Sequence, residues 1–450
     1  MYRKESINIR EWINNSNKAL LVTGARQTGK TWLIRDEIEK SEYSIFEINF
    51  INQPEMIDFL NVSISAEDFL IRLRVILPEN CKPKKTIIFF DEIQKCPEIV
   101  TKIKFLVDEG SYKYVMSGSL LGVELRGITS VPVGYLNVIR MYPMDFEEFM
   151  IANDISGTVL KILKESFESK TRIDDYIHDR LMSLFFIYLI VGGMPDAVKT
   201  YINTKDIREV DKIQKEIVMM YKEDFSQYEN DDKKLKLISI YDVIPSELNK
   251  QNKKFVFTML NKELKFERYE NSFLWLKDAG VVIPVYNTDN PQIPLISSKS
   301  SNVFKLYNSD TGLLTSTYPA QTKIELINRN AETNNGALFE NAVAQQLLSN
   351  GFDLYFFKKK NIGELDFLIE MNGNVGVIEV KSGKDYKKHK ALDNVLNSKD
   401  YHIRQAYVLC TGNIESDGYI TYIPVYLTYL VKEKELSKMI VDVDLGKLKN

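Results

Sequence analysis

The residues that most directly suggest chemistry lie in the stretch GARQTGKT, residues 24–31. Its spacing is G-x-x-x-x-G-K-[ST], in which the glycines let successive backbone N–H groups turn inward around a phosphate chain. The lysine adds a positive charge at the β- and γ-phosphates, and the threonine hydroxyl supplies a ligand for Mg²⁺. The stretch therefore predicts a nucleoside triphosphate site built from Gly24, Ala25, Arg26, Gln27, Thr28, Gly29, Lys30 and Thr31.

A pair of carboxylates follows about sixty residues later, in the stretch KKTIIFFDEIQKCP. Asp91 and Glu92 end an apolar run, and acidic side chains at the carboxyl end of a buried parallel strand lie where such sheets bind ligands. We expect Asp91 to hold the Mg²⁺ shell together with Thr31, and Glu92 to orient and deprotonate the attacking water. An acidic surface turn is the competing interpretation.

A third candidate is a hydroxyl at the end of the next apolar run, YKYVMSGSLLG. Ser117 has the position expected of a residue that senses the γ-phosphate or the water, and Ser119 is the alternative. Because Ser-Gly is also common in ordinary turns, this pattern is less specific than the phosphate loop.

The C-terminal part of the chain contains a second group of acidic residues. Asn372-Gly373 separates two β-like runs, ELDFLIE and VGVIEVKS, and Asn-Gly between such runs is the strongest short signal for a hairpin. A two-residue turn there places Asp366 directly opposite Glu379, with Lys381 on the same face.

Two directly opposed carboxylates, about 5 Å apart at Cβ, repel each other. A divalent cation would relieve that repulsion, and Lys381 would relieve part of it. Two interpretations follow: a metal site, or a surface hairpin with an ion pair. Basic stretches at 358–360 and 384–390 flank the hairpin, where a phosphate backbone would be attracted.

Several elements must position these residues. ALLVT, residues 19–23, predicts a buried strand and TWLIRDEIEK, residues 31–40, a helix, so that the phosphate loop joins strand to helix. Residues 151–230 have a helical, aromatic-rich pattern. Between 231 and 318, helical segments precede two β-like runs, which resembles a winged helix. Lys250, Lys253 and Lys254 could meet phosphates there, although a solvated lysine face or a protein contact explains them equally.

Composition limits the classes of protein that are compatible with this chain. The 450 residues have a formal net charge of −3, so no global basic field indicates a nucleic-acid partner. Three cysteines, widely spaced and odd in number, argue against a disulfide scaffold. The longest apolar run, residues 181–191, is shorter than the roughly 20 residues that span a bilayer. With no apolar N-terminal segment typical of a signal peptide, we expect a cytoplasmic protein without membrane contact.

The three N-terminal stretches resemble the AAA-type branch of P-loop ATPases. Further stretches, SVPVGYLNVIRMYPMDFEEFM, VGGMPDAV and YKEDFSQY, resemble bacterial and archaeal AAA-type ATPases that carry a C-terminal domain of unknown function. The resemblance implies ATP and Mg²⁺ as cofactors and Lys30, Glu92 and Ser117 as catalytic residues. It also implies an arginine that completes a neighbouring copy's site, with Arg140 as the candidate and Arg126 second.

The C-terminal pattern resembles the PD-(D/E)xK nuclease fold. Its four positions are filled by Glu340 on a preceding helix, Asp366, Glu379 and Lys381, while the proline that names the motif is absent before Asp366. In that family the acids bind Mg²⁺ and the lysine positions or activates the hydrolytic water.

We therefore expect an α/β protein: an AAA-type P-loop core at 1–150, a helical lid at 151–230, a winged-helix-like region at 231–318 and a nuclease-like domain at 319–450. The predicted activity is ATP hydrolysis that controls the C-terminal region on DNA. The alternative is an ATP-dependent switch for a protein partner, with an inactive nuclease-like domain. The sequence leaves the oligomeric state and the nuclease activity open.

Overall fold

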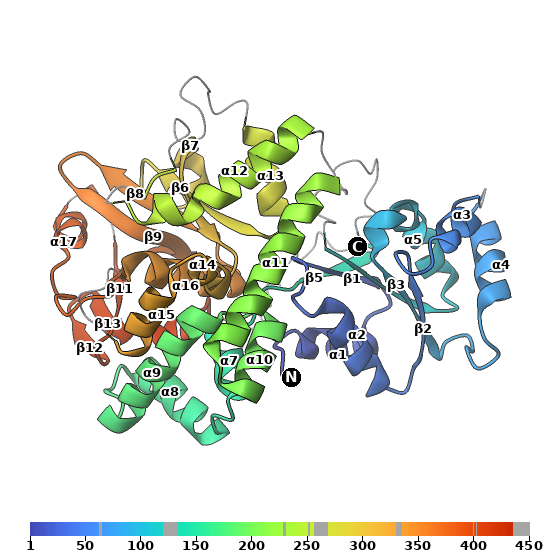
Figure 1. The fold of residues 1–450 in the computed structure, drawn as a ribbon, viewed down its shortest axis with the longest axis horizontal. Coiled ribbons are helices and arrows are strands. Elements are labelled where there is room, and N and C mark those ends of the chain that lie inside the picture. Colours follow the sequence, from blue (N-terminus) through green and yellow to red (C-terminus); the bar gives the residue numbers. More distant parts are fainter. Residues whose placement is uncertain are drawn as a thin grey trace, which may run out of the picture.

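The computed structural model describes residues 1–62, 65–119, 134–227, 231–250, 253–255, 269–329, 335–398, 400–401 and 403–434. Figure 1 shows two lobes, each built on its own β-sheet, with the long helix α11 running between them. The first lobe contains the predicted phosphate loop, and the second contains the predicted acidic hairpin. None of the helices in the described ranges is both long enough and apolar enough to cross a membrane.

The first lobe is a five-stranded parallel sheet in the order β2-β3-β4-β1-β5. The side chains of β1 alternate, so that Ala19 and Leu21 pack into one apolar cluster and Leu20 and Val22 into the other, one on each face of the sheet. This is the covered parallel sheet that the apolar strands predict. The strands are β1 (Ala19–Thr23), β2 (Ser44–Asn49), β3 (Thr86–Asp91), β4 (Lys113–Gly118) and β5 (Leu136–Arg140).

Helices cover both faces of this sheet. One cluster contains residues of α1 and α2, and the other contains residues of α4 and α5. The helices are α1 (Ser6–Asn15), α2 (Lys30–Glu39), α3 (Glu55–Asn61), α4 (Ala66–Ile76) and α5 (Glu98–Glu109), with the short 3₁₀ turn η1 (Ile93–Lys95) after β3.

Helices follow in the region expected to be helical, and the apolar run at 181–191 lies in α9, whose side chains are largely buried. An Asp145–Glu148 capping box starts the first of them, because the Asp145 carboxylate accepts from the backbone of Glu148 and the reciprocal bond is also made. The helices are α7 (Phe146–Ala152), α8 (Gly157–Ser169), α9 (Asp175–Val191), α10 (Pro195–Thr204), α11 (Ile207–Gln227), α12 (Asp231–Leu248) and α13 (Glu270–Asp278).

The second lobe is an eight-stranded mixed sheet in the order β12-β13-β11-β10-β9-β8-β6-β7. Its strands are β6 (Val282–Thr288), β7 (Lys299–Asn308), β8 (Tyr355–Lys359), β9 (Gly363–Met371), β10 (Asn374–Val380), β11 (Gln405–Cys410), β12 (Glu415–Asp417) and β13 (Ile420–Pro424). Its helical elements are η5 (Leu295–Ser298), α14 (Thr311–Ser316), α15 (Ala320–Ile327), α16 (Gly336–Ser349), α17 (Lys390–Leu396) and η6 (Val425–Leu430).

The β9–β10 hairpin has the register that its turn residues predict. Asn372 and Gly373 both have positive φ, 52° and 71°, as a two-residue type I′ turn requires. Asn374 pairs with Met371 and Ile378 with Phe367. The continuation of this register brings Asp366 and Glu379 opposite each other.

The two β-like runs expected to form the wing of a winged helix are part of the C-terminal sheet. β6 pairs with β7 as an antiparallel ribbon and with β8 in parallel, at Tyr286–Tyr355. The sheet therefore crosses the expected boundary at residue 318, because the open edge of β8 offers hydrogen-bonding groups that β6 satisfies. Residues 256–268, which would follow the lysines at 250–254, lie outside the described residues, and the winged helix stays a prediction.

All three cysteines, Cys81, Cys96 and Cys410, are buried and form no disulfide bond with one another.

Candidate functional site

The phosphate loop connects β1 to α2 with two glycines in left-handed conformations. Gly24 has φ +144°, and a Cβ atom there would lie 2.2 Å from the carbonyl oxygen of Met141. Gly29 has φ +88° directly before the first residue of α2. Both positions therefore require glycine, one because the backbone of a neighbouring segment approaches closely and the other because of its φ angle.

Lys30 is the first residue of α2 and is almost fully buried. Its Nζ donates to the carbonyl oxygens of Gly24 and Ala25, at 2.9 and 2.7 Å. Burial lowers the pKa of Lys30 to about 8, against the opposing effect of the carboxylates of Glu92 and Asp91. The ammonium group is thus held inside the loop, at the place where a phosphate chain would meet it.

Asp91 lies at the centre of a network of hydroxyl and amide groups. The Thr31 hydroxyl lies 3.1 and 3.2 Å from its two oxygens, and Asn49 Nδ2 donates to it at 2.9 Å. The Ser117 hydroxyl also donates to Asp91. The donor set of Thr31 and Asp91, at the end of a buried parallel strand, fits a hydrated Mg²⁺ that accompanies a nucleotide.

A cavity of about 820 Å³ opens beside the loop. Glu92 lines it and has a left-handed backbone, with φ +55°, which is uncommon for a glutamate and typical of residues held at functional sites. The amide of Gln94 donates to the Glu92 carboxylate and lies 3.5 Å from the Ser119 hydroxyl. The residues of the loop that line the cavity are Arg26, Gln27, Gly29, Lys30 and Thr31.

The two serines expected as sensor candidates have different places. Ser117 is buried behind Asp91, whereas Ser119 lines the cavity. Of the two arginines expected to act on a neighbouring copy, Arg140 is exposed at the end of the edge strand β5. It lines a separate cavity of about 280 Å³. Arg126 lies outside the described residues.

Three contacts that hold the loop from other elements were not predicted from the sequence. Arg26 forms an ion pair with Asp224 of α11, at 2.8 Å, and its carbonyl oxygen accepts from the Tyr221 hydroxyl. Arg3 is buried and donates to the carbonyl oxygen of Thr28 at 2.6 Å. No local pattern indicates these partners. Tyr221 and Asp224 lie about 200 residues after the loop, and Arg3 lies before it, with α1 and β1 between them.

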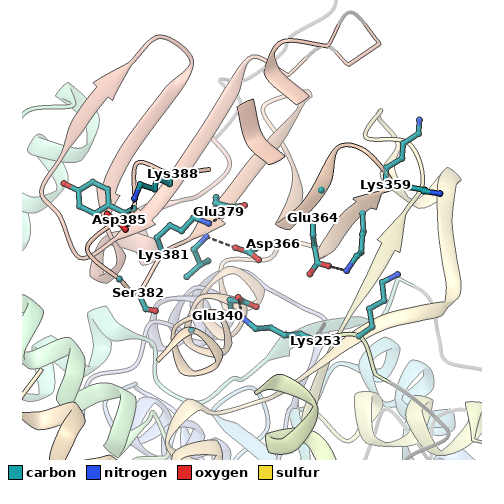
Figure 2. A pocket seen from close by; sticks show the side chains of 18 residues that line it. Lys253, Glu340, Lys359, Glu364, Asp366, Glu379, Lys381, Ser382, Asp385 and Lys388 are labelled. Carbon is teal, nitrogen blue, oxygen red and sulfur yellow. Dashed lines mark hydrogen bonds and ion pairs between the residues drawn. The ribbon is translucent and has the colours of Figure 1, made fainter. Parts of the chain in front are cut away.

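The predicted C-terminal residues line one cavity of about 1110 Å³. Figure 2 shows Glu340, Asp366 and Glu379 facing its interior. Lys381 lies beside Glu379 at 2.8 Å. The backbone N–H of Val380 donates to Asp366 at 3.0 Å. The structure therefore brings together the four residues Glu340, Asp366, Glu379 and Lys381.

Each carboxylate of this group has a lysine close to it. Glu340 is buried, pairs with Lys253 and accepts from the Tyr307 hydroxyl at 2.9 Å. Burial opposes ionisation of Glu340, but Lys253 and Lys305 lower its pKa below the usual range. Burial, and then the charges of Glu340 and Glu379, raise the pKa of Asp366 to about 8.

Lys305 is the residue of this site that the sequence did not reveal. It lies on β7, is fully buried, and its Nζ is 2.8 Å from Glu364, 3.7 Å from Asp366 and 3.8 Å from Glu340. Burial would lower its pKa, but these carboxylates raise it, so Lys305 carries a positive charge at neutral pH.

The acidic residues do not fit the metal site that the nuclease-like pattern predicts. In the described ranges, no group of three or more His, Cys, Asp or Glu side chains is placed so that it could hold a metal ion. Lys305 lies within 4 Å of both Glu340 and Asp366, and of these three carboxylates only Glu379 has a buried oxygen, Oε2, without a hydrogen-bond partner. The metal-binding role of Glu340, Asp366 and Glu379 is thus not supported by this geometry.

Family models match three parts of the chain. Residues 16–150 match an AAA domain, residues 182–323 a domain of unknown function (DUF8612), and residues 335–427 a second domain of unknown function (DUF4143). No curated protein matches the chain.

Several solved structures are similar over part of the chain. The Walker-type ATPase PABY2304 of Pyrococcus abyssi has 13% sequence identity and a TM-score of 0.40, and the match covers 70% of this chain and 94% of that one. Cdc6p from Pyrobaculum aerophilum has 16% identity and a TM-score of 0.25, with 72% and 92% covered. A structure of two coordinating Pif1 helicases unwinding forked double-stranded DNA has 14% identity and a TM-score of 0.23, with 42% and 52% covered.

The match of the AAA model coincides with the sheet, loop and carboxylates described above. The models that match the rest of the chain name no activity, so the nuclease-like and winged-helix interpretations stay predictions. Residues 16–150 form an AAA-type P-loop domain.

Proposed function

We propose that this chain binds and hydrolyses ATP with Mg²⁺, and that its nucleotide cycle controls how the C-terminal region acts on DNA. The observation that carries the proposal is that Lys30, Thr31 and Glu92 line one cavity, while Asp91 lies within hydrogen-bond distance of Thr31. Lys30 and Thr31 begin α2 directly after the phosphate loop, and Asp91 and Glu92 lie at the carboxyl end of β3, where P-loop proteins bind phosphates.

The proposed roles follow from the positions of these groups. Lys30 neutralises charge on the β- and γ-phosphates, and Thr31 and Asp91 hold the Mg²⁺ that enters with ATP. Glu92 accepts a proton from the attacking water. Ser117 fixes the orientation of Asp91, because it donates to that carboxylate, while Ser119 lies in the cavity near Glu92 and is the better placed hydroxyl to sense the γ-phosphate. Arg140, exposed on the edge strand, is proposed to act on a neighbouring copy.

Contacts of α11 support a connection between the nucleotide and the second lobe. The Arg26–Asp224 ion pair holds α11 against the phosphate loop. A γ-phosphate beside Arg26 would compete with Asp224 for the guanidinium group. α11 packs on α12 and α14, α12 packs on β7, and α14 packs on α16, so a shift of α11 would reach the elements that carry Lys305 and Glu340.

ATP turnover with and without DNA tests the proposal. We expect Lys30→Ala to abolish turnover, because the phosphates lose their counter-charge. Glu92→Gln should bind ATP but hydrolyse it about 100-fold more slowly, because the amide cannot accept the proton. Lys40→Ala is the matched control, since this lysine is exposed at the end of the same helix and pairs with Asp36. Unchanged turnover in Lys30→Ala would end the assignment, and stimulation of the wild type by DNA would support the DNA partner.

A second candidate function is a switch for a protein partner with an inactive nuclease-like domain. It is favoured by the absence, in the described part of the chain, of an acidic group that could hold a metal. ATP turnover that responds to no DNA, together with no salt-sensitive DNA binding, would select this alternative.

A further inference from the structure

The ammonium group of Lys305 lies among the C-terminal carboxylates, in the position where a bound cation would be expected. Its ammonium group lies within 4 Å of Glu340, Glu364 and Asp366, which come from one helix and one strand of the sheet. Since its side chain is fully buried, Lys305 cannot exchange this environment for solvent without moving β7. A covalently attached positive charge therefore offsets part of the negative charge of these acids.

Two further lysines complete this compensation. Lys253 pairs with Glu340, and Lys381, the lysine of the nuclease-like pattern itself, pairs with Glu379. Lys253 and Lys305 are ammonium groups that this pattern does not include, and they lie beside Glu340 and Asp366. A divalent cation entering the group would have to displace these lysines or be repelled by them. The chain's own residues thus do the work of charge neutralisation that the nuclease-like pattern assigns to Mg²⁺.

The wall of the cavity is positive overall. Seven lysines and five carboxylates line it, and two of the lysines, Lys359 and Lys360, extend from the end of β8 and the turn that follows. Lys305 adds a further positive charge from its buried position beside Glu364. Figure 2 shows the carboxylates in the middle, Lys359 on one side and Lys388 on the other. Lys388 is paired with Asp385, so the excess of positive charge lies with the lysines at the end of β8. A row of lysines suits a chain of negative charges rather than one metal ion.

A nucleic-acid backbone has this distribution of charge, because its phosphates repeat along the strand and are met by lysines without base recognition. Glu379 lines the cavity, and its buried Oε2 has no hydrogen-bond partner among the described residues. The size of the cavity, about 1110 Å³, is sufficient for more than one nucleotide unit.

We propose that the C-terminal cavity is a metal-independent binding site for the phosphodiester backbone of nucleic acid, in which Lys305 replaces the divalent cation and no strand is cleaved. This inference rests on the proposed function only in taking DNA as the partner. It extends that proposal by naming the C-terminal cavity as the place where DNA binds.

Binding of a fluorescently labelled DNA duplex to the full chain tests the site. At fixed ionic strength, we expect the same affinity in Mg²⁺ and in EDTA. Lys359→Ala with Lys360→Ala should weaken binding about tenfold and reduce the salt dependence by about two released counterions. Lys161→Ala with Lys164→Ala, an exposed pair on α8, is the matched control and should bind like the wild type. Equal binding by the Lys359/Lys360 variant, or no binding by the wild type, would overturn the proposal.

The role of Lys305 is tested by titration with Mn²⁺ in the absence of nucleotide, followed by electron paramagnetic resonance. We expect the wild type to hold no stoichiometric Mn²⁺ in the C-terminal cavity, and Lys305→Met to gain one bound ion. If Lys305→Met does not fold, Glu379→Gln is used instead. A Mn²⁺ ion that the wild type binds and Glu379→Gln does not bind would contradict the proposal. Metal-dependent cleavage of DNA by the wild type that is abolished in Glu379→Gln would also contradict it.

The outcomes separate this inference from the proposed function. Metal-dependent cleavage with normal ATP turnover would end the inference and leave the ATPase assignment intact. Metal-independent DNA binding by a protein without ATP turnover would support the inference and end the ATPase assignment.

Discussion

Asp224 is a buried carboxylate that links α11 to a residue of the phosphate loop. Burial, and then the nearby charge of Glu92, raise its pKa to about 6, although Arg26 lies 2.8 Å away and acts in the opposite direction. The folded protein therefore holds the proton of Asp224 more tightly than the unfolded chain, whose value is 3.8. Protonated Asp224 therefore stabilises the folded protein. This stabilisation is fully present below about pH 4 and is lost as the pH rises through about 6.

Asp224→Asn, which keeps the shape but does not titrate, should consequently gain stability relative to the wild type as the pH rises. We expect the difference in free energy of unfolding between pH 4 and pH 7 to be about 2 to 3 kcal/mol, measured by chemical denaturation. Asp242→Asn is the control, because that carboxylate is half-exposed and pairs with Lys222 at the surface. A parallel pH dependence of the Asp224 variant and the wild type would contradict the assigned pKa.

At the scale of elements, the β9–β10 hairpin sets the distance between Asp366 and Glu379. Its turn depends on Gly373, whose φ of +71° is accessible to glycine at little cost, while no atom lies within 4 Å of the Cβ position. A substitution there therefore changes backbone strain without creating a clash.

Gly373→Ala should lower the free energy of unfolding by about 1 kcal/mol, because alanine is strained in the left-handed region. Gly157→Ala, at the start of α8 with equally open space and no positive φ, should leave the stability unchanged or raise it. Thermal unfolding of both variants measures the contrast. A loss in Gly157→Ala as large as in Gly373→Ala would show that the turn conformation is not the cause.

Local patterns were sufficient for some elements and not for others. The strand–loop–helix at 19–40, the strands ending at Asp91 and Gly118, and the register around Asn372-Gly373 were predictable because neighbouring residues determine them. The pairing of β6 with β8 was not, since Tyr286 and Tyr355 are far apart in the sequence and no local pattern connects them. Lys305 likewise has no sequence signal, because a lysine in a strand with several polar residues is expected to face solvent, and its partners come later in the chain.

At the scale of the whole molecule, the contacts of α11 predict that nucleotide changes the second lobe. The helix touches the phosphate loop through Asp224 and packs on α12 and α14. We expect a non-hydrolysable ATP analogue with Mg²⁺ to change amide hydrogen exchange in α11, α12 and β7, as measured by mass spectrometry.

Asp224→Ala should still bind the analogue and lose the changes in α12 and β7, since the ion pair that transmits them is absent. Lys30→Ala should show none of the changes. Equal changes in the wild type and in Asp224→Ala would exclude this route between the lobes.

The pairing of β6 with β8 has an evolutionary consequence. The matches to the two domains of unknown function meet between residues 323 and 335, yet strands from both segments belong to one sheet. A recombination event at that junction would separate β8 from its neighbour β6 and leave an unpaired edge strand that is prone to aggregation. We therefore expect these two segments to be inherited together as a single unit.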